Sequence, residues 1–82
     1  MTKPKMLYVE WLDSAGTSGW IRDTEFPELE AVVCCTLGFI VKESKTSLVL
    51  ALNYNTAPHT SGRFGEAMSI PKVAILRRRV IR

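Results

Sequence analysis

The chain opens with a stretch in which apolar and polar positions alternate. In Leu7–Asp13 the apolar residues Leu7, Val9 and Trp11 fall on one side of an extended backbone. Side chains of a β-strand point alternately to its two faces, so this pattern predicts a half-buried strand. Leu48–Tyr54 repeats the alternation, with leucines at every second position, and predicts a central strand of the same sheet.

A third strand is predicted between these two. Ala31–Glu43 is rich in valine, cysteine, phenylalanine and isoleucine, which prefer extended backbone. Gly38 lies in its middle, where a long strand of a small sheet can bulge or bend. The polar stretch Glu43–Ser47 then predicts a tight hairpin connection to the next strand.

The remaining pattern adds two short strands, a helical turn and a long loop. Residues 20–30 suit a short helical turn, which Pro27 keeps short. Asn55–Glu66 has almost nothing to bury and predicts the longest loop. Ala67–Ile70 predicts a brief strand that ends at a corner at Pro71, and Val73–Ile81 predicts the fifth strand.

Together these elements predict an all-β fold, a five-stranded small barrel with one helical turn. A chain of 82 residues has room for one domain, residues 1–82, of which we expect residues 1–5 to be flexible. Such a small domain hides only about 60 to 65% of the surface of its unfolded chain, so its own core contributes little stability. We therefore expect a homo-oligomer.

The cysteines and the N-terminus bear on the compartment. Cys34 and Cys35 are adjacent and point to opposite faces of a strand, which predicts two free thiols that act as small core residues. Residues 1–5 are polar and give no sign of an export signal, so we expect a cytoplasmic protein. The longest apolar run, Ala31–Val41, is about half of the roughly 20 residues that a membrane-spanning helix needs, so no membrane span is expected.

No catalytic or metal-binding constellation is apparent in the sequence. The single histidine, His59, lies in the predicted loop, and the two cysteines do not have the spacing of zinc ligands. The carboxylates concentrate in the acidic turn, where a solvated surface explains them. We therefore expect a protein that is not an enzyme and that uses no cofactor or metal.

Charge is distributed unevenly along the chain. The formal net charge of +3 combines an acidic first half with a basic end that includes Arg77, Arg78 and Arg79. This asymmetry favours an anionic partner. On a strand, Arg77 and Arg79 share one face and Arg78 takes the other. They would either contact phosphates or protect a solvated sheet edge against aggregation.

The predicted loop is the second candidate site. Gly62 and Gly65 would let backbone amides approach an anion, and Arg63 adds a charged donor, although a plain connecting loop would have the same composition. Tyr54 and Phe64 border the loop and could stack on bases. The complete set of candidate ligand-binding residues is Tyr54, Asn55, His59, Thr60, Ser61, Gly62, Arg63, Arg77 and Arg79.

Four short segments carry a family resemblance. They are Val9–Asp13, Gly19–Trp20, Leu37–Val41 and Ile70–Ile75, and they resemble small uncharacterised proteins of tailed bacteriophages and prophages over nearly the whole chain. More distantly, the bent strand after a helical turn and the basic final strand resemble Sm-like and Src-homology-type barrels. The chain lacks the Asn-Gly loop pair of Sm proteins, so their uridine pocket is not implied.

Two functions are compatible with these features. The first is a non-enzymatic protein that binds a phosphate-bearing ligand, either nucleic acid or a small nucleotide. In a phage setting, it could be a sponge that sequesters a cyclic-nucleotide defence signal of the host. The alternative is an interaction module that inhibits or adapts a host or virion protein through an exposed strand edge or an apolar patch.

Overall fold

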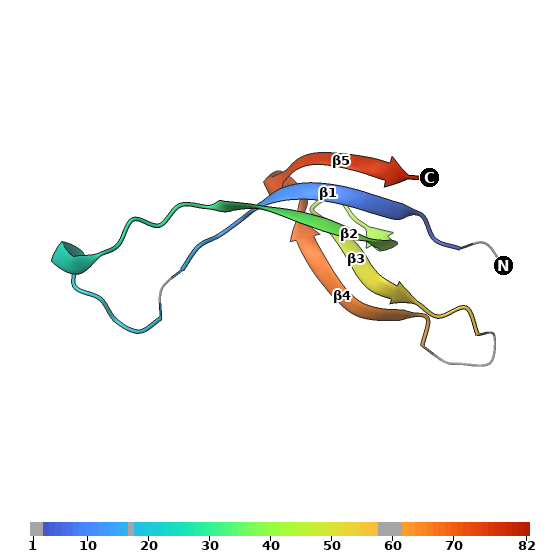
Figure 1. Cartoon of the computed structure of the whole chain (residues 1–82), viewed down its shortest axis with the longest axis horizontal. Helices are drawn as coiled ribbons and strands as arrows, with labels where there is room; N and C mark the ends of the chain where they lie inside the picture. Colours follow the sequence, from blue (N-terminus) through green and yellow to red (C-terminus); the bar gives the residue numbers. More distant parts are fainter. Residues whose placement is uncertain (1–2, 17, 58–61) are drawn as a thin grey trace.

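A computed structural model of the protein describes residues 3–16, 18–57 and 62–82. These residues form one antiparallel sheet in the order β4-β3-β2-β1-β5 (Figure 1). The strands are β1 (Met6–Asp13), β2 (Val32–Glu43), β3 (Ser47–Tyr54), β4 (Phe64–Pro71) and β5 (Ile75–Ile81). Consecutive strands pair through hairpins from β1 to β4, and β5 returns to pair with β1.

Two 3-10 turns are the helical elements of the described chain. Turn η1 (Asp23–Glu25) lies within the segment where the sequence predicts a helical turn, which is thereby confirmed. Turn η2 (Lys72–Ala74) follows the predicted corner at Pro71 and was not expected. No helix in the described residues has the length and the apolar character needed to cross a bilayer.

The predicted all-β class is confirmed, but the predicted barrel is wrong. The described strands form no ladder between β4 and β5, so both remain free edges of an open, curled sheet. Figure 1 shows the reason: β4 and β5 meet at the η2 corner and then diverge, β4 following β3 and β5 following β1. Closing a barrel requires the two edge strands to run side by side in register.

Strand boundaries agree with the predictions to within a residue or two, except around β4. That strand begins at Phe64, three residues earlier than predicted, because residues 64–66 extend the ladder with β3 instead of belonging to the loop. β5 begins at Ile75, two residues later than predicted, since η2 occupies the intervening residues.

The hydrophobic core is small. Its main cluster of fully buried side chains comes from the concave face of β1, β3 and β4, and the half-buried Trp11, Ile40 and Ile75 pack against it. The buried cluster consists of Leu7, Val9, Leu48, Leu50 and Ile70. The alternation predicted for β1 is therefore confirmed, whereas in β3 it holds for two of its three leucines. Leu52 is 63% exposed because it lies just beyond Ala51, the residue at which pairing between β2 and β3 ends.

Gly38 marks the closest approach between β2 and β3. A Cβ at this position would lie 2.8 Å from the backbone oxygen of Ala51 and 3.3 Å from Leu50 Cβ. The predicted bulge occurs slightly later, between Ile40 and Lys42, where one extra residue of β2 bends the strand. Gly38 therefore permits tight packing of the two strands, and the neighbouring bulge provides the bend.

An extended arm, residues 14–31, leaves the sheet between β1 and β2 (Figure 1). It makes the molecule 57 Å long but only 26 by 21 Å across. The radius of gyration is 16.7 Å, whereas a compact domain of this length has about 12 Å. Every described arm residue is exposed except Ile21, which is half-buried. The arm therefore adds no core to the domain.

Candidate functional site

A shallow cleft lies beside the predicted loop, where β3 ends and β4 begins. Its volume is about 290 Å³, and its lining includes four predicted site residues: Tyr54, Asn55, Gly62 and Arg63. The rings of Tyr54 and Phe64 line it, with their centroids 5.4 Å apart and their planes tilted, and the Tyr54 centroid lies 5.9 Å from that of Phe39. Three further predicted site residues, His59, Thr60 and Ser61, lie outside the described residues.

The polar groups of this cleft hold the ends of the loop together. Asn55 N donates to Arg63 O at 2.7 Å, and Asn55 Nδ2 donates to Gly62 O at 3.3 Å. Arg63 Nη1 donates to the carbonyl oxygens of Asn55 and Ala57 at 3.1 and 3.3 Å. Arg63 therefore acts in part as a clamp on its own loop, a role that composition alone did not indicate.

Arg77 and Arg79 lie away from this cleft. They are on β5, which is four strands away from β4 across the sheet. Arg77 pairs with Glu10 and Arg79 with Tyr8 of β1, so both side chains share the convex face, as their alternation predicts. The structure thus divides the predicted site residues between two separate places.

The convex face of β2, β1 and β5 is organised in cross-strand rows. One row joins Leu37, Tyr8 and Arg79, whose guanidinium carbon lies 6.0 Å from the centre of the Tyr8 ring. The next row joins Cys35, Glu10 and Arg77. We call these two rows the basic face, because their two exposed arginines outnumber the single carboxylate.

Tyr8 is the polar centre of the basic face. Its hydroxyl donates to Glu10 Oε2 at 2.9 Å and lies 3.3 Å from Cys35 Sγ. Hydrogen bonding to Cys35, and then to Glu10, raises the pKa of the Tyr8 phenol above its usual value. Like any tyrosine, Tyr8 is neutral at physiological pH, and its ring offers an aromatic surface beside the arginines.

The cysteines are free thiols, and the prediction that both act as core residues is wrong. Cys35 is exposed because it lies on the uncovered convex face, and Cys34 is half-buried because this part of β2 pairs with β1 before its ladder with β3 begins. Desolvation, followed by the nearby Asp13 carboxylate, raises the pKa of the Cys34 thiol. Within the described ranges, no group of three or more histidine, cysteine and acidic side chains is arranged to hold a metal ion.

Arg78 takes the concave side of β5, opposite to its two neighbours. Its Nη1 and Nη2 lie 3.0 and 3.1 Å from the two carboxylate oxygens of Glu43, and Lys72 Nζ lies 2.6 Å from Glu43 Oε2. This paired geometry connects the final strand to the end of β2 and to η2. The hydrogen bonds from Arg78 and then Lys72 lower the pKa of Glu43 to about 2.

The Glu43 network makes stability depend on pH. Because the pKa of Glu43 is lower in the folded chain than its ordinary value of 4.5, its contribution is complete above pH 4.5 and is lost as the pH falls towards 2. We expect Glu43→Gln to unfold at lower urea concentration than the wild type at neutral pH, and this difference to vanish near pH 2. Urea titrations across this range, with the exposed arm variant Glu30→Gln as a control, measure it. A constant difference at every pH would contradict the prediction.

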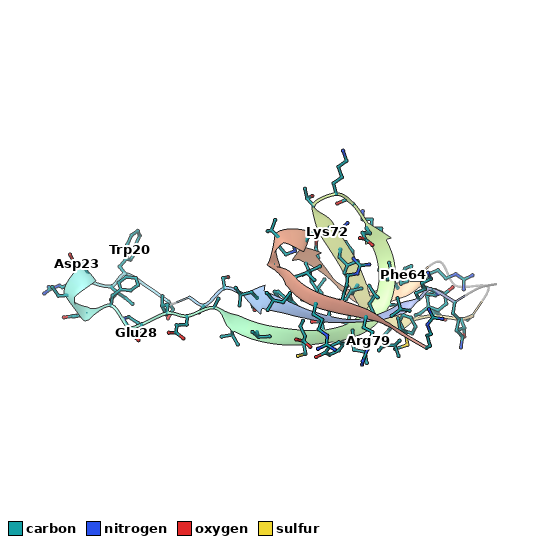
Figure 2. The ribbon with its side chains drawn as sticks, turned by 90° about the horizontal axis from the view of Figure 1, so that it is seen from above. Trp20, Asp23, Glu28, Phe64, Lys72 and Arg79 are labelled. Atoms are coloured by element: carbon teal, nitrogen blue, oxygen red, sulfur yellow. The ribbon has the colours of Figure 1, made fainter. Side chains whose placement is uncertain are left out.

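The arm is a surface that the sequence analysis missed. Trp20 is fully exposed, and Phe26 and Leu29 are 56% and 42% exposed. In Figure 2, Trp20, Asp23 and Glu28 lie at the tip of the arm, far from Phe64, Lys72 and Arg79 on the body. The available signal was the presence of large apolar residues in a segment with no strand alternation and no helical period.

Comparisons with protein-family models, with curated proteins and with solved structures give no match for this chain. The candidate sites are therefore the cleft, the basic face and the arm, each defined by its own geometry.

Proposed function

We propose that this protein is a non-enzymatic interaction module that binds another polypeptide through its arm. The observation that carries the proposal is the full exposure of Trp20, with Phe26 more than half exposed on the same arm. A tryptophan buries about 150 to 250 Å² when it is covered, and tryptophans are enriched among the residues that dominate binding energy at protein interfaces.

The setting of these rings supports the proposal. They project from a segment that packs against no core, so they add nothing to the stability of the isolated chain. Exposed apolar surface of this kind, bordered by charged residues, is typical of protein interaction sites. Asp23, Glu25 and Glu28 provide such a border.

Removing the arm's aromatic rings should weaken binding without affecting folding. We expect Trp20→Ala/Phe26→Ala to weaken association with the bound polypeptide by at least about 2 kcal/mol, the usual scale of a dominant interface residue. The measurement is retention of a polypeptide by the tagged protein purified from cells that express it. A photo-crosslinking residue at position 20 identifies what the arm contacts.

Val73 supplies the matched control. It is almost completely exposed but lies in η2 on the body of the molecule. Val73→Ala should therefore leave binding unchanged, and a crosslinker at position 73 should not capture the polypeptide that the arm binds. If the crosslinker at position 20 captures no polypeptide, or if the two variants bind equally well, the arm is not the binding surface.

A phosphate-bearing ligand is the second candidate, and the basic face favours it. Arg77, Arg79 and the neutral ring of Tyr8 lie side by side there, and this combination suits phosphates next to stacked bases. The ligand would be nucleic acid or a small nucleotide, including the cyclic nucleotides that a phage protein could sequester.

Titration with oligonucleotides and cyclic dinucleotides at two salt concentrations tests the second candidate. Arg77→Ala/Arg79→Ala should abolish binding, and a steep dependence on salt would favour nucleic acid over a single nucleotide. Arg63→Ala distinguishes the loop cleft from the basic face. Absence of any binding below about 100 μM would exclude this function, since even non-specific nucleic-acid complexes are about that tight.

A further inference from the structure

The arm and the basic face carry opposite charge. The described part of the arm bears four carboxylates, Asp23, Glu25, Glu28 and Glu30, against one arginine. The basic face bears Arg77 and Arg79, both exposed, against one carboxylate, Glu10. Arg78 is excluded from this balance because Glu43 already pairs with it on the other side of the sheet.

The two surfaces also match in their apolar content. Phe26 and Leu29 of the arm are exposed, and so are Leu37 on the basic face and the adjoining pair Leu12 and Val33. These last three side chains share the convex face because their positions in β1 and β2 have the same alternation as Tyr8. Each surface therefore offers apolar contacts and complementary charge to the other.

Within one chain these two surfaces lie apart. The arm extends along the long axis of the molecule, away from the sheet, and Figure 2 places its acidic tip far from Arg79. An acidic arm that meets a basic face of this kind must therefore come from another molecule. Electrostatic complementarity between two such surfaces guides association and fixes the register of docking.

The exposed area agrees with a second copy as the partner. The chain exposes 6494 Å², whereas a compact monomer of 9.2 kDa exposes about 4,900 Å². The excess is roughly 1,600 Å², about twice what one partner buries in an interface of standard size. The excess is therefore enough for each chain to donate an arm and to accept one.

We propose that the protein forms a two-fold dimer in which the arm of each copy docks on the basic face of the other. This inference rests on the proposed function, because it names a second copy as the polypeptide that the arm binds. In such an exchange the same pair of contacts occurs twice, since two-fold symmetry makes each arm meet the same face.

Charge exchange tests the contact directly. Light scattering of the purified 82-residue chain at about 100 μM should give twice the monomer mass, because an interface of this size can hold a dimer together at that concentration. Arg77→Glu/Arg79→Glu alone and Glu25→Arg/Glu28→Arg alone should each raise the dissociation constant at least about tenfold, and the quadruple variant should restore it to within about threefold. Lys3→Glu/Lys45→Glu changes the net charge as much as the first variant, at exposed positions outside both surfaces, and should leave the dimer intact.

The possible outcomes separate this inference from the proposed function. A monomeric wild type would overturn the dimer, and a crosslink from position 20 to a different polypeptide would then preserve the proposed function alone. Failure of the quadruple variant to restore association would also overturn the dimer. If Arg77→Glu/Arg79→Glu loses oligonucleotide binding and the quadruple variant does not restore the dimer, these arginines bind phosphates and not the arm.

Discussion

Leu50→Ala should lower the free energy of unfolding by about 2 to 5 kcal/mol, the range measured when a leucine is removed from a close-packed core. Leu50 is only 1% exposed and lies at the centre of β3, paired with Ile40 on one side and Met68 on the other. Because the buried cluster contains only five side chains, its loss leaves a cavity that few neighbours can fill. Urea denaturation followed by circular dichroism measures the effect.

Leu52→Ala is the matched control for this prediction. Leu52 is on the same strand, two positions later, but it is 63% exposed. Its replacement should cost less than about 1 kcal/mol, as expected for a side chain that buries little surface. Equal losses for the two variants would mean that the core does not lie where β3 places it.

Gly38→Ala should destabilise the chain by about 1 to 3 kcal/mol, the usual cost of overpacking. The added Cβ would lie 2.8 Å from the Ala51 backbone oxygen, a contact that no flexible side chain can relieve. To accommodate the methyl group, β2 and β3 must separate beside the Phe39–Ala51 pair, where their ladder begins. The midpoint of thermal or urea unfolding should fall accordingly.

Gly16→Ala provides the comparison. Nothing lies within 4 Å of the position where its Cβ would be, and its backbone does not need a positive φ. This substitution should be neutral or slightly stabilising, by up to about 1 kcal/mol, because it restricts the unfolded chain. If Gly38→Ala were as harmless as Gly16→Ala, the close approach of β2 and β3 would not constrain the fold.

The strands were predictable because their signal is local. Leu7, Val9 and Leu50 are buried as their alternation requires, and Pro71 ends β4 as a residue without an amide hydrogen should. Closure of the sheet is not local. It depends on the path that β4 and β5 take after the η2 corner, and no pattern within either strand encodes that path.

The candidate sites were predictable only in part, for a related reason. The alternation of Arg77, Arg78 and Arg79 between two faces was deduced correctly, because it follows from strand geometry alone. The partner of Arg78 was not, since Glu43 is distant in the sequence and only the curl of the sheet brings them together. The exposure of Trp20 was also missed, because composition does not reveal whether a ring packs against its own chain.

The arm leaves the sheet between two strands whose pairing extends from Met6–Phe39 to Asp13–Val32. The buried cluster of the sheet and the exposed rings of the arm therefore lie on different residues of the chain. If the arm binds a polypeptide as proposed, substitutions at Trp20 and Phe26 should change what is bound without disturbing the buried cluster. Because loops tolerate sequence change better than a buried core, the binding specificity of such a scaffold can diverge quickly. The β1–β2 connection is the natural place to graft a new recognition sequence.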